Sequence, residues 1–284
     1  MKIFIDGKII PSEKATISVF DRGLFYGDGV FESLRTYNGK AFQLDEHLKR
    51  LVKGTKSLKI RLPYSIKQLK QAVVKTIAAN KFEESYIKII VTRGKSMGHG
   101  LDPRNVEGKA TLIIIVEKQK VFSQKIYSSG WKAIISSVKK ANVPISKIKS
   151  LNYLDNILAK IEANKTGANE AILLDEKGNI AEGTISNIFI VKHGTIYTPP
   201  ADSPILPGLT RKLTIKLARQ SAFKIIEKVI SPKELYTADE CFITFSGAGV
   251  VPITRIWNKK ISKGKCGPIT SGLIGLYAAE TKKI

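Results

Sequence analysis

A lysine and a glutamate in short polar segments have the residue types needed for carbonyl and ring chemistry. Lys149 lies in the segment 147–153, between a predicted strand and a predicted helix. A partly desolvated lysine amine can form a Schiff base with a carbonyl group. Glu182 lies beside Gly183, where a carboxylate could hold the proton of a pyridinium ring. In a chain with 47 lysines and arginines, an ordinary surface lysine and an ordinary turn glutamate are the default explanations of these two residues when each is taken alone.

Three further features are suited to an anionic ligand. The segment 206–211 is a Pro/Gly turn that runs into a predicted helix, so the free backbone N–H groups and the Thr210 hydroxyl could bind an anion. The segment 246–249, Ser-Gly-Ala-Gly, follows a predicted strand and allows close approach of a phosphate to the backbone. Arg50 lies on a predicted helix. Each feature also has a plain explanation as a helix start, a turn or a surface arginine.

Both helices and strands are predicted to position these residues. Apolar spacing predicts helices over 45–58, 65–80, 154–166 and 209–220. Runs rich in β-branched residues predict strands over 2–6, 30–37, 86–92, 111–117, 131–138, 170–175, 186–191, 224–230 and 241–245. The fold class is therefore α+β. We expect an N-terminal domain over 1–120, a linker over 121–130 and a C-terminal domain over 131–284, with glycines making the loop 94–108 mobile.

Composition narrows the class of protein. The chain has 284 residues, 43% of them hydrophobic, and no apolar run approaches the roughly 20 residues of a membrane-spanning helix. Asp6 interrupts the first apolar residues, so we expect no signal peptide. Cys241 and Cys266 form neither a disulfide framework nor a metal motif, which favours the cytoplasm and no metal site. The net charge of +23 is scattered along the chain without a nucleic-acid-binding motif, so we expect a lysine-rich surface and no nucleic-acid partner.

Six motifs in one order carry a resemblance that covers essentially the whole chain. They occupy 20–32, 44–51, 149–154, 170–175, 182–187 and 207–211. In these motifs the chain resembles the class IV aminotransferases, pyridoxal-phosphate enzymes of fold type IV. The resemblance implies a D-amino-acid-aminotransferase-like fold, with a smaller N-terminal α/β domain and a larger C-terminal β-rich domain with helices. It also implies a homodimer or a higher homo-oligomer and pyridoxal 5′-phosphate as the cofactor.

The resemblance also implies a role for each matching residue. Lys149 forms the Schiff base and moves the substrate proton, and Glu182 keeps the pyridine nitrogen protonated. Tyr153 hydrogen-bonds the phenolic oxygen of the ring. The phosphate is bound by Arg50, Leu209, Thr210, Ser246 and Gly247. This assignment agrees with the chemistry, since a dianionic phosphate requires a guanidinium and helix-start N–H groups.

Within the family, the chain resembles the branched-chain aminotransferases most in the segments 92–94, 100–104, 152–154 and 266–270. The implied reaction transfers the amino group between leucine, isoleucine or valine and 2-oxoglutarate. Apolar and aromatic side chains suit such substrates, while a few polar groups hold the carboxylates. The implied substrate residues are Tyr26, Phe31, Arg35, Tyr86, Lys88 and Ala248.

The chain departs from the usual branched-chain aminotransferase sequence at three places, which leaves other activities within the family open. Lys88 stands where branched-chain enzymes usually have an arginine and lacks its bidentate fork. Ser33 replaces a common glycine, and a hydroxyl there is a feature of aminodeoxychorismate lyases, which release 4-aminobenzoate and pyruvate. The turn 246–249 differs from the usual Thr-Ala-Ala-Glu type and would alter carboxylate contacts. His99, without an accompanying arginine, gives weaker support to a D-amino-acid or amine transaminase, and a basic non-enzymatic binding protein is the remote alternative.

Overall fold

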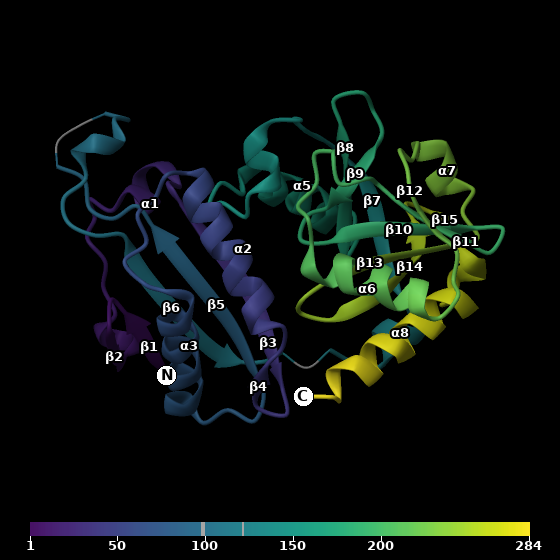
Figure 1. Cartoon of the computed structure of the whole chain (residues 1–284). Coiled ribbons are helices and arrows are strands. Elements are labelled where there is room, and N and C mark those ends of the chain that lie inside the picture. Colours follow the sequence, from purple (N-terminus) through teal and green to yellow (C-terminus); the bar gives the residue numbers. More distant parts are fainter. Residues whose placement is uncertain (98–99, 121) are drawn as a thin grey trace. The chain divides into compact units, whose positions relative to one another are not determined.

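A computed structural model of the chain describes residues 1–97, 100–120 and 122–284, and its residues form two compact units. The first unit comprises Met1–Lys120, Ile148–Asn152 and Ile284, and the second comprises 122–147 and Tyr153–Lys283. The segment that contains Lys149 thus packs with the N-terminal unit, although the sequence analysis assigned it to the C-terminal domain. Figure 1 shows the chain from N- to C-terminus.

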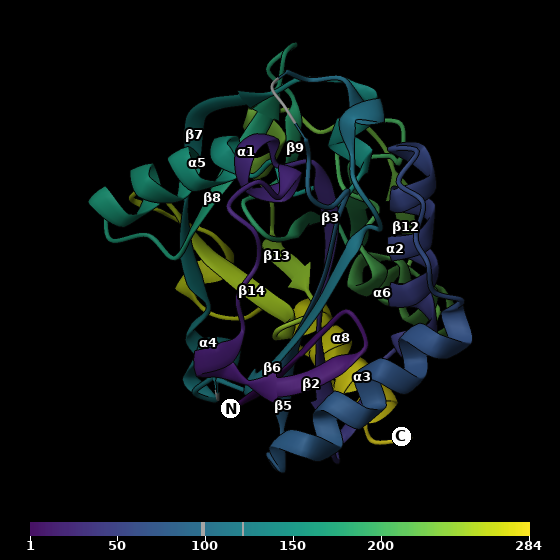
Figure 2. The same ribbon diagram turned by 90° about the vertical axis from the view of Figure 1, so that its left-hand side faces the viewer.

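The first unit is a six-stranded sheet with two helices on one face (Figure 1). The strand order is β2-β1-β6-β5-β3-β4, and β2, an edge strand, lies toward the viewer in Figure 2. The strands and helices of this unit are β1 (Lys2–Ile5), β2 (Lys8–Pro11), η1 (Ser12–Lys14), α1 (Arg22–Tyr26), β3 (Gly29–Tyr37), β4 (Lys40–Ala41), α2 (Leu44–Ser57), α3 (Ile66–Asn80), β5 (Ser85–Thr92), η2 (Pro103–Asn105) and β6 (Thr111–Lys118).

The alternation of side chains in β3, β5 and β6 divides this sheet into two faces. On one face Val30, Leu34, Ile87 and Ile89 are buried together with apolar residues of α2 and α3. On the other face the alternate residues are only partly buried. α3 begins at a capping box in which Ser65 and Gln68 satisfy each other's backbone N–H groups. Side chains on the half-buried face are therefore partly accessible to a ligand.

The second unit is built on a nine-stranded mixed sheet with the order β12-β11-β10-β13-β14-β7-β8-β9, in which β15 also pairs with β14. Its strands and helices are α4 (Lys125–Ser129), β7 (Trp131–Lys140), η3 (Pro144–Lys147), α5 (Leu154–Lys165), β8 (Glu170–Asp175), β9 (Ile180–Gly183), β10 (Asn187–Lys192), β11 (Thr195–Thr198), α6 (Leu209–Gln220), β12 (Ile225–Glu227), α7 (Pro232–Tyr236), β13 (Glu240–Phe245), β14 (Gly249–Ile256), β15 (Lys259–Lys260), η4 (Ser262–Gly264) and α8 (Pro268–Thr281).

The connection between β9 and β10 requires this second sheet to curl. The two strands lie far apart in the strand order, with β13, β14, β7 and β8 between them. A flat sheet would separate them by about 24 Å at the usual strand spacing. Residues 184–186, which join them, span at most about 14 Å. The sheet therefore bends round, and the Gly183 N–H donates to the Ser186 carbonyl at 2.7 Å across the connection.

Two segments differ from the expected linker and strand pattern. Residues 122–130 contain α4, and Phe122, Ile126 and Tyr127 pack against the core of the second unit, while residue 121 lies outside the described residues. The strand expected over 224–230 is only Ile225–Glu227. β9, which contains Glu182, and the long helix α8 were not predicted from the sequence.

Candidate active site

The half-buried face of the first sheet gathers most of the predicted substrate residues. In the β3–β5 register Ser33 lies opposite Lys88 and Arg35 lies opposite Tyr86. Residues that lie opposite each other, or two apart, on antiparallel strands project to the same face. The side chains on this face include Phe31, Ser33, Arg35, Tyr86 and Lys88. Two aromatic rings and two cations therefore share one surface.

Contacts on this face connect the rings to the polar groups. The Lys88 ammonium lies 5.4 Å from the centroid of the Phe31 ring. Burial raises the pKa of Tyr86, and a side-chain hydrogen bond with Ser33 opposes that shift. The Ser33 hydroxyl thus has Tyr86 as a partner. Arg35 stacks its guanidinium over the Tyr37 ring at 4.3 Å.

Lys149 lies against β3 at the edge of the same sheet. The Phe31 N–H donates to the Lys149 carbonyl at 2.9 Å, and the Leu151 N–H donates to the Gly29 carbonyl at 3.0 Å. Ser150 forms an isolated bridge with Val30 between these two bonds. This short pairing places the Lys149 Nζ 4.4 Å from the centroid of the Phe31 ring. The geometry brings the predicted catalytic lysine beside a predicted substrate residue.

Arg50 is held by a buried acid that the sequence analysis did not single out. Glu32 projects from β3 toward α2 and is fully buried. The Arg50 Nε lies 2.7 Å from Oε1 of Glu32, and Nη2 lies 2.8 Å from Oε2. The His47 Nδ1 lies 2.6 Å from Oε2. Because an ionised carboxylate only accepts hydrogen bonds, Nδ1 carries the hydrogen in this arrangement.

Electrostatics set the ionisation of this cluster. Burial alone would raise the pKa of Glu32, but the hydrogen bonds and positive charge of Arg50, with help from His47, lower it to about 2. Burial lowers the pKa of His47, and the charges of Arg50 and Lys149 lower it further against the opposing effect of Glu32. The cluster is therefore an arginine cation, a carboxylate anion and a neutral imidazole.

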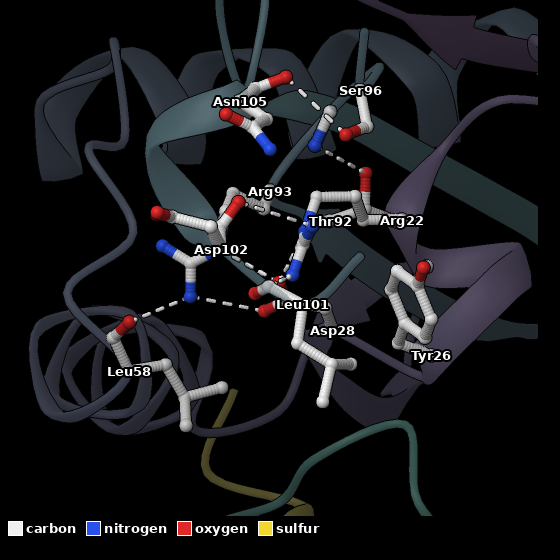
Figure 3. A network of polar contacts seen from close by, with 12 residues as sticks. Arg22, Tyr26, Asp28, Leu58, Thr92, Arg93, Ser96, Leu101, Asp102 and Asn105 are labelled. Carbon is white, nitrogen blue, oxygen red and sulfur yellow. Dashed lines mark hydrogen bonds and ion pairs between the residues drawn. The ribbon is translucent and has the colours of Figure 1, made fainter. Parts of the chain in front are cut away.

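Tyr26 belongs to a polar cluster that ties α1 to the loop 94–108 (Figure 3). The Asp28 carboxylate accepts a hydrogen bond from Nε of Arg22 at 2.8 Å. It also accepts hydrogen bonds from Nε and Nη2 of Arg93, at 2.7 and 3.0 Å. The buried Arg22 guanidinium also donates to the Leu101 carbonyl at 2.9 Å. The Tyr26 hydroxyl donates to the carbonyl of residue 100 at 3.3 Å, and the Tyr26 ring lies under Arg22. Hydrogen bonds from Arg22 and Tyr26 to backbone carbonyls therefore anchor the described part of this loop, while His99 lies outside the described residues.

Glu182 is buried in the second unit with a partner on each carboxylate oxygen. Oε1 forms an ion pair with the ammonium of Lys140. Oε2 accepts the Leu206 N–H at 2.8 Å and the Asn187 Nδ2 at 3.4 Å. The Asn187 Nδ2 also donates to the Leu206 carbonyl at 2.9 Å, so the carboxylate lies at the turn that leads into α6.

Backbone donors are available next to this carboxylate. Gly208 is the N-cap of α6. Because it has no side chain, it cannot accept a capping hydrogen bond from the N–H groups of the first turn, which include those of Leu209 and Thr210. A Cβ at Gly208 would lie 2.0 Å from Oδ1 of Asn187, so glycine is required for this close packing. The start of α6 and Glu182 are thus neighbours, as a ligand with a phosphate and a ring nitrogen would require.

The remaining predicted cofactor residues lie on other turns of the second unit. Ser246, Gly247 and Ala248 form the turn of the β13–β14 hairpin, and the Ala248 carbonyl accepts the Tyr127 hydroxyl at 3.0 Å. Tyr153 is the residue before α5. A buried glutamate, Glu170, holds the turn after β9 by accepting the Thr184 N–H at 3.0 Å and the Ser186 hydroxyl at 2.8 Å.

The described residues contain neither a membrane-spanning helix nor a metal cluster. Within 1–97, 100–120 and 122–284, no helix combines the length and the apolar character needed to cross a membrane. Over the same ranges, no group of three or more histidine, cysteine, aspartate or glutamate side chains is arranged to hold a metal ion.

Comparison with known proteins establishes the family. The family model described as amino-transferase class IV matches residues 29–256. The chain is a class IV aminotransferase. This confirms the predicted family, the predicted enzyme class and the predicted two-domain α+β fold of fold type IV.

Individual relatives of this aminotransferase support the same conclusion. A Methanocaldococcus jannaschii protein provisionally named a branched-chain-amino-acid aminotransferase is 43% identical over 275 residues, covering 96% of this chain and 94% of its own. The D-alanine aminotransferase of Bacillus licheniformis is 34% identical over 278 residues, covering 96% and 94%. The solved structure of the Escherichia coli branched-chain amino acid aminotransferase has a TM-score of 0.92 at 32% identity and covers 98% of this chain and 95% of its own.

Proposed function

We propose that this aminotransferase uses pyridoxal 5′-phosphate to transfer the amino group between branched-chain L-amino acids and 2-oxoglutarate. The observation that carries the proposal is the half-buried face of the first sheet, where Phe31 and Tyr86 lie beside Lys88, Arg35 and Lys149. Aromatic walls suit the side chains of leucine, isoleucine and valine, and the cations suit carboxylates. The many branched-chain enzymes among its relatives support the same substrates.

The residues fit the cofactor. Pyridoxal phosphate, when bound, supplies an electron sink for the charge that develops at Cα. Lys149 would supply the amine that binds the cofactor aldehyde as a Schiff base with loss of water, and, once the substrate amine displaces it, the free amine would carry the proton to and from Cα. The buried carboxylate of Glu182 supplies the negative charge that a protonated pyridine nitrogen needs.

The phosphate and ring oxygen have their own proposed partners. Arg50 contributes a guanidinium and α6 contributes the N–H groups of Leu209 and Thr210. The hairpin turn contributes Ser246 and Gly247, and Ala248 in the same turn contributes to the substrate carboxylate site. Tyr153 donates to the phenolic oxygen. A structurally similar branched-chain enzyme, solved with N-(5′-phosphopyridoxyl)-L-glutamate, supports a site that takes a phosphopyridoxyl group and a glutamate together.

We also propose that the protein is a homodimer or a higher homo-oligomer of the cytoplasm. α5 exposes Leu154, Ile157, Leu158 and Ile161, with exposed fractions of 75%, 52%, 53% and 44%. These positions follow helical spacing and form one apolar stripe. An exposed apolar stripe of this kind is typical of a protein interface. Cys241 and Cys266 are free thiols, as expected for a reducing compartment.

A half-reaction assay tests the function directly. The purified enzyme loaded with pyridoxal phosphate is mixed separately with L-leucine, L-glutamate, D-alanine, D-glutamate and aminodeoxychorismate, and the visible absorbance of the bound cofactor is followed. We expect rapid bleaching by L-leucine and little response to the D-amino acids. Bleaching by D-alanine but not L-leucine would contradict the proposed substrates. Release of 4-aminobenzoate and pyruvate without a response to L-leucine would identify a lyase instead.

A further inference from the structure

Lys140 is the counter-ion of the proposed pyridine partner. It is the last residue of β7, and its side chain is 15% exposed where it pairs with Oε1 of Glu182, itself 6% exposed. Oε2 of Glu182 accepts hydrogen bonds from the Leu206 N–H and the Asn187 side-chain amide. These three groups come from three separate segments, and the Lys140 ammonium places a positive charge at Oε1.

The ion pair affects both the charge and the orientation of the carboxylate. A buried carboxylate with no cation beside it tends to take up a proton, because burial penalises the charged form. A protonated Glu182 would lack the charge that stabilises a protonated pyridine ring. A carboxylate held at only one oxygen can also rotate about its last torsion, which is broad.

The neighbouring Lys139 shows that the ion pair with Glu182 depends on the position of the lysine in β7. Lys139 is exposed, and successive residues of a strand project to opposite faces. The two lysines have the same chemistry and neighbouring positions, but the pair with Glu182 is formed by Lys140. Lys139 is therefore a matched control.

We propose that Lys140 is a positioning residue that fixes the Glu182 carboxylate, ionised and in one orientation, for the pyridine nitrogen of pyridoxal phosphate. The inference rests on the proposed function, since the pyridine ring is the expected partner of Glu182. Lys140 acts through Glu182 and needs no contact with the cofactor.

The test compares two aldehydes that differ only at the ring nitrogen. Dissociation constants are measured for pyridoxal phosphate and for its 1-deaza analogue, which has a benzene ring in place of the pyridine. We expect Lys140→Met to weaken binding of pyridoxal phosphate about tenfold, the effect of losing one charge-assisted hydrogen bond. Binding of the deaza analogue should not change. Lys139→Met should change neither constant, and Lys140→Arg should restore the affinity for pyridoxal phosphate.

Each other result counts against the inference in a distinct way. Equal losses for both aldehydes would show that Lys140 only maintains local structure, and tighter binding of pyridoxal phosphate would show that its charge competes with the ring. If Lys140→Met does not fold, Lys140→Gln replaces it, because glutamine removes the charge and keeps N–H donors. If the wild-type protein binds neither aldehyde, the proposed function is contradicted together with this inference. If the wild-type protein binds pyridoxal phosphate and the Lys140→Met variant binds it equally well, only this inference is contradicted.

Discussion

Glu32 on β3 and Arg50 on α2 form a two-point ion pair on the buried face of the first sheet. Nε and Nη2 of the guanidinium reach separate carboxylate oxygens at 2.7 and 2.8 Å. A two-point pair fixes the plane of the guanidinium as well as its position. If Arg50 holds the cofactor phosphate, Glu32 and its partner His47 determine the direction in which the remaining N–H groups point.

Replacing Glu32 by glutamine should destabilise the protein and change its response to acid. Loss of the anion removes the two-point ion pair of Arg50 in a largely buried site, which costs about 3 kcal/mol of unfolding free energy at neutral pH. The pKa of Glu32 is lowered from 4.5 to about 2 in the folded protein, so its stabilising effect is present above pH 4.5 and is lost as the pH falls toward 2. Urea unfolding between pH 7 and pH 2 measures both effects.

The matched control for this prediction is Glu46→Gln on α2, the helix that carries Arg50. The Glu46 side chain is 38% exposed and pairs with the exposed Lys49, so its replacement should leave the unfolding free energy nearly unchanged. The difference in stability between wild type and Glu32→Gln should shrink as the pH falls from 4.5 to 2. A difference that stays constant over this range would show that the Glu32 charge does not stabilise the folded state.

Arg22→Met should loosen the loop that follows β5. The Arg22 guanidinium pairs with Asp28 and donates to the carbonyl of Leu101, and it is almost fully buried. We expect a loss of about 3 kcal/mol in unfolding free energy and faster proteolysis within 94–108. Arg104→Met is the control, because Arg104 is exposed and pairs with Asp102, two residues away. Equal proteolysis rates for the two variants would count against the anchoring role of Arg22.

The sequence predicted the elements that have a clear apolar period. The expected helix over 45–58 is Leu44–Ser57, and the expected strand over 30–37 is Gly29–Tyr37. α8 was missed because its buried positions include Thr270 and Thr281, which give no apolar stripe. β9 was missed because it has only four residues, one of them Glu182. Both elements are defined by long-range packing that a local pattern does not contain.

The sequence predicted which residues form the candidate site, but not the ion pairs that hold them. Lys149, Glu182 and Arg50 stand in recognisable motifs, whereas their counter-ions lie elsewhere in the chain. Lys140 is 42 positions from Glu182, and no spacing rule relates them. Glu32 did leave a signal, because it occupies an inward position between Val30 and Leu34 in an alternating strand. A charged residue at such a position indicates a buried partner.

Lys88→Arg should improve the use of glutamate more than the use of leucine. Lys88 projects from the face that carries Phe31 and Tyr86, and its ammonium is a point charge. An arginine at this position could hold the side-chain carboxylate of glutamate at two points, which lowers KM for L-glutamate about tenfold. KM for L-leucine should change little. Steady-state kinetics with both donors measure the effect, and an equal change for both would show that Lys88 does not discriminate between them.

Lys149→Ala should abolish transamination and the visible absorbance that pyridoxal phosphate gives with the enzyme, because the variant lacks the proposed amine. Lys147→Ala is the control, since Lys147 is an exposed lysine two residues earlier. It should retain both the absorbance and the activity. Spectra recorded after gel filtration show whether the cofactor remains attached. Persistent activity in the Lys149→Ala variant would contradict the assignment of Lys149.

Leu158→Lys should weaken the proposed dimer without unfolding the chain. Leu158 lies in the exposed apolar stripe of α5, whereas the buried side of the same helix, Ala159 and Ala163, packs against β7 and β8. A lysine would add a charge to the interface and leave that packed side unchanged, and lysine is a good helix former. Sedimentation velocity should show a shift from dimer to monomer, and circular dichroism should show an unchanged helix content. Val74→Lys on α3 is the control, because Val74 is 52% exposed and is also apolar. If Leu158→Lys sediments as the wild type does, the stripe on α5 is not the dimer interface.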